Sequence, residues 1–429
     1  MKLLRQSDAA YGAFRSSLNR RAIPDTSVSE IVTGIIADVQ ERGDAALIDL
    51  TARFDRAELT PETLLVSAEE IAEATAQVSA ETVAAIESTR QNIHLFTEQS
   101  QRQDWSYVNK EGATVGERFT PFDRVGIYVP GGKAPLVSTA LMTGAFAQAV
   151  GCPEIVAATP CGPDGKVNPE LLYALVQAGA TEIVKVGGAQ GIAALALGTQ
   201  TVAPVEKVFG PGNAFVVEAK RQLVGAVSID LLPGPSEIMV IADETGNPAY
   251  MAADLLGQAE HGPDSEIGFV TTSEALFTAV QQEIQAQLPS LSRGEYLLEV
   301  LEKKCFALLV DDLHEAIAIC NDYAPEHLTL VTVDEDAVLP QIRNAGAIYV
   351  GNYSAVAVGD FLAGPSHTLP TGGAGKSFSG LRADQFQRRQ SIVRMDATAI
   401  QNSLATVQEF SRIEGLDAHG ASVAIRVAE

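Results

Sequence analysis

The sequence predicts an α/β fold made of two Rossmann-like, doubly wound units, with helical segments at the N- and C-termini. Three observations support this prediction. The chain has 429 residues, more than one ordinary hydrophobic core needs. From residue 124 onward, short apolar strand-like runs alternate with segments of helical length. The stretch Pro-Gly-Pro at residues 233–235 interrupts this alternation and indicates a crossover between two sets.

The composition excludes several classes of protein. Hydrophobic residues make up 46% and charged residues 20%, which is typical of a folded globular protein. A net charge of −24 would repel a phosphate backbone or an anionic membrane surface, so we expect no nucleic acid and no membrane partner. The uncharged stretches 134–153 and 186–205 are rich in small residues, which favours buried helices over bilayer spans. With four cysteines, no CxxC pair and no signal peptide, a soluble cytoplasmic protein with reduced thiols is expected.

The first 110 residues are expected to be helical. SVSE at residues 27–30 and SAEE at 67–70 have the spacing of capping boxes, and apolar residues follow them at helical intervals. Strands and helices then alternate over residues 124–243 and again over 248–350. The expected division is listed by range: an N-terminal helical segment (1–20), a first α/β domain (21–123 and 237–378), a second α/β domain (124–236) and a C-terminal helical segment (379–429).

Three glycine turns follow strand-like segments of the second domain. They are YVPGGKAP at residues 128–135, VGGAQG at 186–191 and FGPGNA at 209–214. Ligands of open α/β sheets bind at the carboxyl ends of the strands, where glycines let backbone amides approach a phosphate. The usual GxGxxG fingerprint is absent after any strand. Together the three turns favour a nucleotide or another anionic ligand.

Four of the six histidines lie in loops bounded by glycine or proline, each within seven residues of an acid. In GQAEHGPD, Gln258 and His261 are one helical turn apart and can face the same point. Asp360 is the only charged residue in the apolar loop 349–375, where a carboxylate is costly unless it is paired or binds a cation. With His419 these residues could form a four-ligand zinc site, although glutamine is an uncommon ligand and such spacings also recur by accident.

A second polar pair, Glu326 and His327, lies in APEH at residues 324–327. Pro325 disfavours helix in the residue before it, so the preceding helix should end there and the pair should project from a turn before a strand. An adjacent acid and imidazole on a short rigid turn suit two separate proton transfers. The spacing alone also allows a helix-ending turn with two solvated side chains.

These motifs resemble the histidinol dehydrogenase family. The matching segments run in the family's order from about residue 120 to 422: RVGIYVPGG, VGGAQGIAAL, FGPGNAFVVEAKR, PGPSEIMVIAD, GQAEHGPDS, YAPEHLTL, GDFLAGPSHTLPTGG and EGLDAHGAS. Two departures touch no expected ligand: Ser366 stands where members commonly carry Asn, and Ala355-Val356 stands where they carry a prolyl turn.

The resemblance implies the last reaction of histidine biosynthesis, the four-electron oxidation of L-histidinol through L-histidinaldehyde to L-histidine, with reduction of two NAD. By this resemblance His327 would take the alcohol proton in the first hydride transfer and serve again in the second. Glu326 would activate the water that hydrates the aldehyde. One Zn²⁺ per active site would be held by four residues, listed here: Gln258, His261, Asp360 and His419.

The same resemblance implies the remaining contacts. Its substrate contacts fall on Ser236, His367 and Glu414, on His327, and on the four zinc residues. Its NAD contacts fall on Tyr128, Gln190 and Asn213, one from each glycine turn. The family is a homodimer in which the C-terminal segment crosses over, so Glu414 and His419 are expected to enter the site of the other subunit.

Two other functions also fit part of the pattern. A zinc hydrolase with a Glu326-activated water explains the metal ligands but leaves the three glycine turns without a role. A non-catalytic small-molecule binding protein would tolerate loss of the Glu326–His327 pair, so substitution of His327 distinguishes it from an enzyme.

Overall fold

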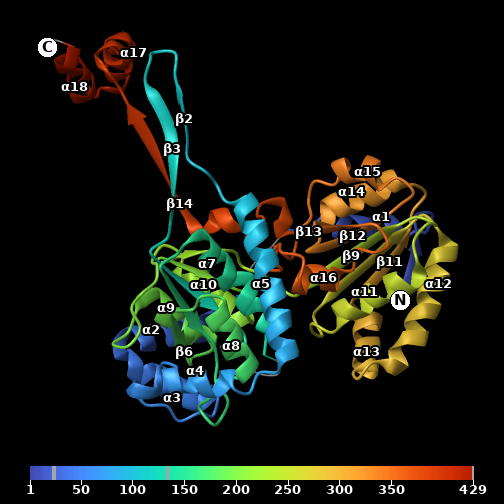
Figure 1. Ribbon diagram of the computed structural model, residues 1–429. Helices are drawn as coiled ribbons and strands as arrows, with labels where there is room; N and C mark the ends of the chain where they lie inside the picture. The colour runs from blue at the N-terminus through green and yellow to red at the C-terminus, as the bar shows by residue number, and fades with distance from the viewer. Residues whose placement is uncertain (22–25, 132–134, 428–429) are drawn as a thin grey trace.

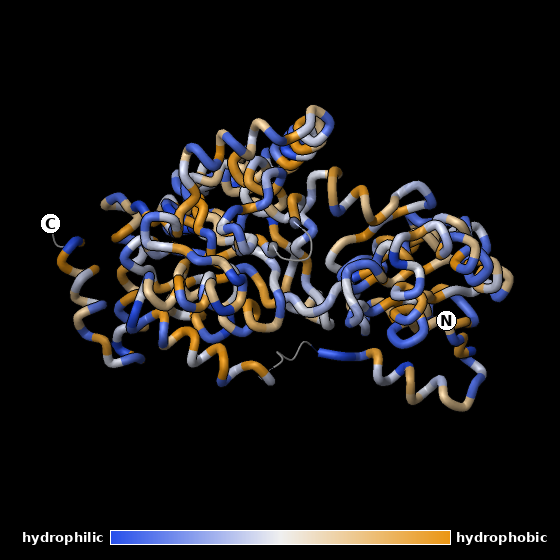
Figure 2. The backbone as a smooth tube through the Cα atoms, turned by 90° about the horizontal axis from the view of Figure 1, so that it is seen from below, coloured by the Kyte–Doolittle hydropathy of each residue, from blue (hydrophilic) through white to orange (hydrophobic). Residues whose placement is uncertain are grey.

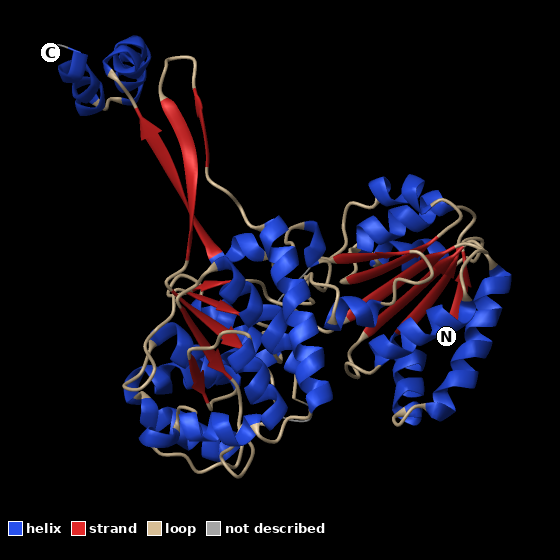
Figure 3. Cartoon of the chain, in the orientation of Figure 1, coloured by secondary structure: helices blue, strands red, loops and turns tan. Residues whose placement is uncertain are grey.

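Two parallel β-sheets organise the computed structural model, which describes residues 1–21, 26–131 and 135–427. One sheet has the order β6-β5-β4-β7-β8, and the other has the order β1-β11-β10-β9-β12-β13. Counted along the chain within each unit, β4–β8 and β9–β13 both follow the 3-2-1-4-5 order of Rossmann-like folds. Figures 1 and 3 show the two sheets as separate fans of strands, each between helices. The predicted fold class is confirmed.

The first unit is built on the five-stranded sheet. Its strands are β4 (Arg124–Tyr128), β5 (Glu154–Ala158), β6 (Glu182–Val184), β7 (Lys207–Phe209) and β8 (Ser228–Ile229). One face packs against α2 (Ser29–Arg42), α3 (Asp44–Phe54), α9 (Gly188–Leu197) and α10 (Ala214–Leu223). The other face packs against α4 (Ala68–Thr75), α5 (Ala80–Ser100), α6 (Val137–Ala140), α7 (Phe146–Val150) and α8 (Pro169–Gln177), with a π-helical turn (Leu141–Ala145) between α6 and α7.

The second unit is built on the six-stranded sheet. Its strands are β1 (Lys2–Arg5), β9 (Glu237–Ala242), β10 (Glu266–Thr271), β11 (Cys305–Leu309), β12 (His327–Val331) and β13 (Ala347–Val350). One face packs against α11 (Pro248–Ala259), α12 (Glu274–Gln287), α13 (Gly294–Lys304) and the start of α16 (Val356–Phe361). The other face packs against α1 (Tyr11–Ser17), α14 (Leu313–Tyr323) and α15 (Glu335–Val338).

A long arm projects from the first unit (Figure 1). It consists of an antiparallel sheet of β2 (Trp105–Val108), β3 (Thr114–Pro121) and β14 (Gln387–Arg394), followed by α17 (Ala397–Glu414) and α18 (Asp417–Val427). The two helices pack on each other at the far end of the arm, away from both parallel sheets (Figures 1 and 3). The C-terminal segment therefore contains a strand, β14, before its two helices, where the sequence predicted only helix.

The packing of the N-terminal half differs from the predicted division. The helices of residues 29–100 cover the sheet of residues 124–229, whereas the sequence analysis grouped them with residues 237–378. The apolar stripe of Val32, Ile35 and Val39 is buried in that core, which explains the pairing. The segment 1–20 begins with strand β1, which pairs with β11, and only then forms α1. SAEE caps α4 as predicted, but α2 begins at Ser29 with Val28 at the N-cap position.

Two expectations about the chain's surface and thiols can be compared with the structure. Within the described residues, no helix is both long enough and apolar enough to cross a bilayer. All four cysteines are free thiols, as expected, and three of them are buried. Burial raises the pKa of Cys320 to about 12, so this thiol is unreactive near neutral pH.

A buried ion pair ties the turn after β7 to the segment after β8. Lys220 on α10 pairs with Asp230, and neither side chain is exposed. Lys220 Nζ also donates to the Gly210 carbonyl oxygen at 2.9 Å, while Asp230 Oδ2 accepts from the Gly210 amide at 2.8 Å. Removing one partner would leave an uncompensated charge in the core.

We expect Lys220→Met to lower the free energy of unfolding by about 3–5 kcal/mol, because Asp230 would remain buried without its cation. Urea denaturation followed by circular dichroism measures this change. Lys303→Met is the matched control, since Lys303 forms an exposed ion pair with Glu299 at 2.5 Å. The control should unfold almost as the unsubstituted protein does; equal losses in the two variants would contradict the prediction.

Candidate active site between the two units

Glu326 and His327 lie at the amino end of β12, next to the start of β9. Helix α14 ends as predicted before Pro325, and Ala324 adopts a left-handed conformation with φ of 54°. This conformation is costly for a residue other than glycine, and it turns the chain sharply into the strand. Both side chains are buried, with 7% of Glu326 and 3% of His327 exposed, so the solvated alternative is wrong.

The backbone of one residue, Glu237, holds both members of the pair. The Glu237 amide donates to Glu326 Oε2 at 2.8 Å, and His327 Nδ1 donates to the Glu237 carbonyl oxygen at 2.9 Å. A carbonyl oxygen can only accept, so the proton of a neutral His327 resides on Nδ1. In that neutral form His327 Nε2 is an acceptor; it is buried, makes no hydrogen bond and lies 3.4 Å from Asp360 Oδ1.

The environment shifts both groups towards proton uptake. Burial raises the pKa of Glu326 to about 8, which favours its protonated form at neutral pH. Burial alone would lower the pKa of His327, but the attraction of Glu326 and the interaction with Asp360 outweigh burial and raise this pKa to about 9. Both groups therefore hold a proton at neutral pH, and each must release it before it can act as a general base.

Glu237 was not predicted as a site residue. Its carboxylate accepts from the Gly372 amide at 2.8 Å and pairs with Arg20 at 2.6 Å. Burial raises the pKa of Glu237 to about 7, although the cation Arg20 opposes the shift. The sequence carries a signal for it, because Glu237 is an acidic residue that opens the otherwise apolar strand EIMVIA. It positions the Glu326–His327 pair through its main chain.

Asp360 and His367 come from the segment that joins the two units. Asp360 lies in the helix α16, whereas the sequence analysis placed it in a loop. A helix can form there because the first proline of this segment is Pro365, beyond the end of α16. His367 Nδ1 donates to the Asp360 carbonyl oxygen at 3.0 Å, and its Nε2 lies 3.2 Å from Thr139 Oγ1 in the first unit. Ser366 Oγ donates to the Met142 carbonyl oxygen at 2.9 Å, which adds a second bond between the units.

Three of the four predicted zinc ligands belong to this region. Gln258 is 2% exposed in the last turn of α11, and its Nε2 is buried without a hydrogen-bond partner. A carboxamide can be reversed, so the same group can present its oxygen to a cation. His261 follows the helix end, its amide donates to the Gln258 carbonyl oxygen at 3.3 Å, and it is close enough for the charge of Asp360 to act on it. The Gln258 carboxamide, the His261 imidazole and the Asp360 carboxylate are suitable zinc ligands, and they are one short of the usual four.

The fourth predicted ligand, His419, lies elsewhere. Both His419 and Glu414 are exposed in the C-terminal helices at the end of the arm, away from the parallel sheets (Figure 1). Accordingly, the described part of the chain contains no cluster of three or more His, Cys, Asp or Glu side chains able to hold a metal ion. Ser236, a predicted substrate contact, is partly exposed directly before Glu237, and its carbonyl oxygen accepts from the Glu266 amide at 3.0 Å.

The predicted nucleotide residues lie at three turns on the carboxyl edge of the first sheet. The Tyr128 hydroxyl accepts from the Gly188 amide at 2.9 Å, and Asn213 Oδ1 caps α10 by accepting from the Phe215 amide at 3.1 Å. Gln190 is buried in the first turn of α9. Gly210 has φ of 111°, and a Cβ there would lie 2.2 Å from the Tyr128 carbonyl oxygen, so only glycine fits. Residues 132–134 of the first turn lie outside the described residues.

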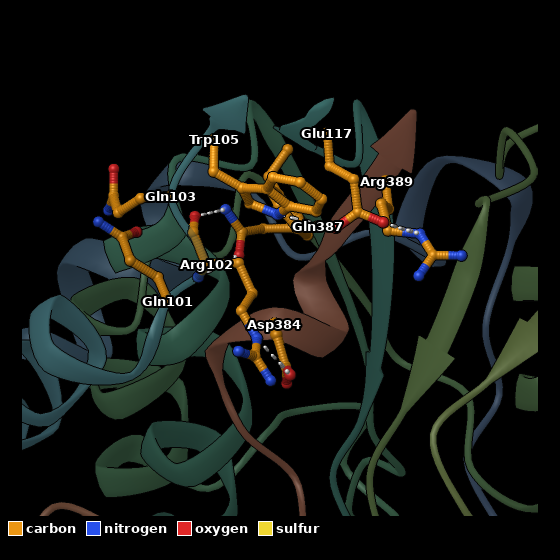
Figure 4. A pocket seen from close by; sticks show the side chains of 9 residues that line it. Gln101, Arg102, Gln103, Trp105, Glu117, Asp384, Gln387 and Arg389 are labelled. Atoms are coloured by element: carbon orange, nitrogen blue, oxygen red, sulfur yellow. Dashed lines mark hydrogen bonds and ion pairs between the residues drawn. The ribbon is translucent and has the colours of Figure 1, made fainter. Parts of the chain in front are cut away.

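The two halves of the site meet at α6. This helix follows the first glycine turn, and its Thr139 contacts His367. A chain of contacts from His327 through Asp360 and His367 to Thr139 thus links the Glu326–His327 pair to the helix that follows the first glycine turn. Figure 4 shows a different hollow, at the base of the arm, where Trp105 donates to Glu117 at 3.0 Å and Arg389 pairs with Glu117 at 3.3 Å. Its charged groups pair with one another, so it offers less to a ligand.

Comparison with known proteins agrees with this arrangement. Residues 18–427 match the family described as histidinol dehydrogenase. The chain is 42% identical to the histidinol dehydrogenase of Desulfotalea psychrophila over 424 residues, with 98% of each chain covered. It is 41% identical to that of Syntrophotalea carbinolica over 430 residues, with both chains fully covered. The crystal structure of histidinol dehydrogenase from Elizabethkingia anophelis superposes with a TM-score of 0.95 at 35% identity, covering 100% of this chain and 98% of that one.

The fold and the site define an α/β protein of two Rossmann-like units with a buried glutamate–histidine pair at the amino end of a strand of the second unit. The chain belongs to the histidinol dehydrogenase family, as the sequence motifs predicted. It is therefore an oxidoreductase of histidine biosynthesis that acts on a small molecule.

We expect Gly359→Ala to reduce activity at least tenfold, since an added Cβ would lie 2.2 Å from Tyr349 Oη and would push α16, with Asp360, out of position. Initial rates of histidinol oxidation, together with the thermal midpoint, measure the effect. Gly257→Ala is the control, because nothing lies within 4 Å of its added Cβ. A Gly359→Ala enzyme as active as this control would show that the position of α16 does not matter.

Proposed function

We propose that this protein oxidises L-histidinol through L-histidinaldehyde to L-histidine, reducing two NAD, with a zinc ion bound in each active site. The observation that carries the proposal is the bare Nε2 of His327 beside Glu326, in a buried site that borders the glycine turns of the first sheet. A zinc hydrolase would leave these turns without a role. The family assignment also favours an oxidoreductase.

In the first oxidation, His327 Nε2 takes the hydroxyl proton of histidinol while a hydride leaves the carbinol carbon for the nicotinamide of NAD. The Asp360 carboxylate, with Oδ1 3.4 Å from Nε2, stabilises the imidazolium that forms. Glu326 then accepts a proton from a water molecule whose oxygen adds to the aldehyde carbon. Before the second oxidation His327 releases its first proton to solvent, and a second NAD replaces the NADH. His327 then takes a proton from the hydrated aldehyde as the second hydride leaves for this NAD, and the carboxylate of histidine results.

Gln258, His261 and Asp360 would hold the zinc ion from one chain, with His419 as the fourth protein ligand. When bound, zinc supplies a Lewis-acidic centre that can take the imidazole and amine of histidinol and so fix the orientation of its carbinol carbon. Ser236, His367 and Glu414 are proposed as further substrate contacts. His367 Nδ1 bonds to the Asp360 carbonyl oxygen and Nε2 to Thr139 Oγ1, so a substrate contact through Nε2 would replace the bond to Thr139.

The proposed NAD site is the carboxyl edge of the first sheet. There Tyr128 ends β4, Gln190 lies in the first turn of α9 and Asn213 caps α10, one in each glycine turn. Backbone amides at such turns can approach a pyrophosphate, and this edge borders the acid–base pair through Thr139. The four free thiols agree with a cytoplasmic enzyme.

The proposed partner is a second copy of this chain, with exchange of the arm. The arm exposes large apolar side chains far from either core: Trp105, Tyr107, Val108, Ile392, Val393, Phe410, Ile413, Leu416 and Ile425. Apolar residues recur along the helix next to the C-terminus in Figure 2. Such an extended apolar surface is typical of a segment that packs on another subunit. Exchange would also bring Glu414 and His419 to a site that lacks them.

We expect two NADH per L-histidinol consumed, because the two hydrides leave the same carbon in succession. Absorbance at 340 nm against histidinol and histidine quantified by chromatography measures the ratio. His327→Asn should lower kcat at least a hundredfold while histidinol affinity survives, since only the proton acceptor is lost. A ratio of one, or an unchanged kcat in His327→Asn, would contradict the mechanism; absence of NADH would favour a hydrolase.

Exchange of the arm predicts complementation between two inactive variants. Glu326→Gln lacks the base that activates water and His419→Ala lacks the zinc ligand, so each alone should form little histidine from histidinol, and His419→Ala should also contain less zinc by atomic absorption. In a mixed dimer with exchanged arms, one of the two sites has both residues intact. Co-expressed variants should therefore show about a quarter of the unsubstituted activity. Inactive mixtures would show that Glu326 and His419 act from the same chain.

A further inference from the structure

A charged cluster lies at the amino ends of β9 and β10, and its cation is Arg20 of the N-terminal segment. Arg20 Nη2 lies 2.6 Å from Glu237 Oε1, and Arg20 Nη1 donates to Glu266 Oε2 at 2.5 Å. The Glu237 side chain is only 3% exposed and that of Arg20 is 20% exposed. Burial favours protonation of Glu237, and the Arg20 cation opposes it. Arg20 is therefore the counter-charge of a carboxylate in the core.

The Arg20 guanidinium also contacts the residue from which the turn to the acid–base pair begins. Its Cζ lies 3.6 Å from the centroid of the Tyr323 ring, a distance at which a guanidinium stacks on an aromatic face. Tyr323 ends α14, and its hydroxyl donates to the same Glu266 Oε2 at 2.8 Å. One planar cation thus connects the end of α14 with the first residues of two strands.

The backbone of Arg20 is held as well. Lys376 Nζ donates to the Arg20 carbonyl oxygen at 2.6 Å and to Asn19 Oδ1 at 2.9 Å. The segment after α16, which includes Lys376, also supplies the Gly372 amide to the Glu237 carboxylate at 2.8 Å. The N-terminal segment, the start of β9 and the segment after α16 therefore meet at the Glu237 side chain.

These contacts bear on the reaction because the main chain of Glu237 holds both members of the acid–base pair. Its amide donates to Glu326, and its carbonyl oxygen accepts from His327. A shift at the start of β9 would therefore change both bonds at once. A displacement of about 1 Å in a reacting group can lower a rate about a hundredfold, so the side-chain contacts of Glu237 matter for the proton transfers.

We propose that Arg20 is a positioning residue for the oxidation of histidinol. It fixes the Glu237 carboxylate on one side and the Tyr323 ring on the other, and so sets the geometry of the Glu326–His327 pair. Its carboxylate partners are not among the proposed zinc ligands. Loss of Arg20 should therefore slow the proton transfers and leave zinc and histidinol binding intact. This inference rests on the proposed roles of Glu326 and His327.

The test compares Arg20→Met with Arg15→Met. Arg15 is the matched control, because it belongs to the same N-terminal segment, and its side chain is 17% exposed. It pairs with two carboxylates of α14, Glu315 at 2.9 Å and Asp322 at 2.7 Å. On the full-length zinc-loaded protein, NADH formation gives kcat, calorimetry gives histidinol affinity and atomic absorption gives zinc content.

Arg20→Met should lower kcat at least tenfold, while zinc content and histidinol affinity stay within about twofold of the unsubstituted values. Arg15→Met should lower the thermal midpoint but keep kcat within about twofold, since its partners do not hold the acid–base pair. All rates are measured well below the thermal midpoint of each variant, so that a loss of folded protein does not enter kcat.

A second substitution tests whether Arg20 acts through Glu237. Glu237→Gln removes the charge but keeps an oxygen that can accept from the Gly372 amide. In the double variant Arg20→Met/Glu237→Gln no buried carboxylate is left without its cation. Its kcat should be at least threefold above that of Arg20→Met. It should also be at least twofold below that of the unsubstituted protein, because the Tyr323 ring has lost the guanidinium.

The outcomes separate this inference from the proposed function. Equal losses of kcat in the two arginine variants, or parallel losses of kcat, zinc and histidinol affinity in Arg20→Met, would mean that Arg20 only supports the fold. A double variant no faster than Arg20→Met, or as fast as the unsubstituted protein, would show that Arg20 does not position the pair in the way inferred. In each case the inference is wrong and the NAD-linked reaction stands. If the unsubstituted protein forms no NADH from histidinol, the proposed function itself is wrong.

Discussion

The two hydrogen bonds from the Glu237 main chain to Glu326 and His327 are the interaction on which the site depends. Because β9 and β12 are adjacent parallel strands, the start of one strand supplies a donor and an acceptor to the side chains that open the other. The bond to His327 Nδ1 also selects the tautomer and leaves Nε2 free. The sheet thus sets both the position of the pair and the tautomer of His327. Arg20 pairs with the buried carboxylate of Glu237.

The two units present opposite edges of their sheets to the site. The first unit presents the carboxyl ends of its strands, where open α/β sheets usually bind ligands. The second presents the amino ends of β9 and β12, while Asp243 at the carboxyl end of β9 is occupied by the amides of Thr245 and Val333. Two copies of one topology therefore contribute different features to the site: the first unit contributes the glycine turns, and the second contributes the buried pair of Glu326 and His327.

Much of this could be predicted from sequence because it is local. The alternation of strands and helices, the end of α14 before Pro325 and the three glycine turns follow from short-range patterns. The partners of the N-terminal helices could not be predicted, because an apolar stripe does not specify which of two sheets it covers. The role of Glu237 was missed because its main chain, which has no sequence signature, makes the decisive contacts. The arm strand β14 was missed because its alternation of exposed polar and apolar residues lacks a buried face.

The His367 side chain has a mechanical consequence. Its ring bonds to Thr139 of the first unit and to the Asp360 carbonyl oxygen of the second, so it connects the two units directly. Any rotation of one sheet relative to the other would stretch these two hydrogen bonds and tilt α16. Motion of the two units relative to each other is therefore coupled to the orientation of the Asp360 carboxylate.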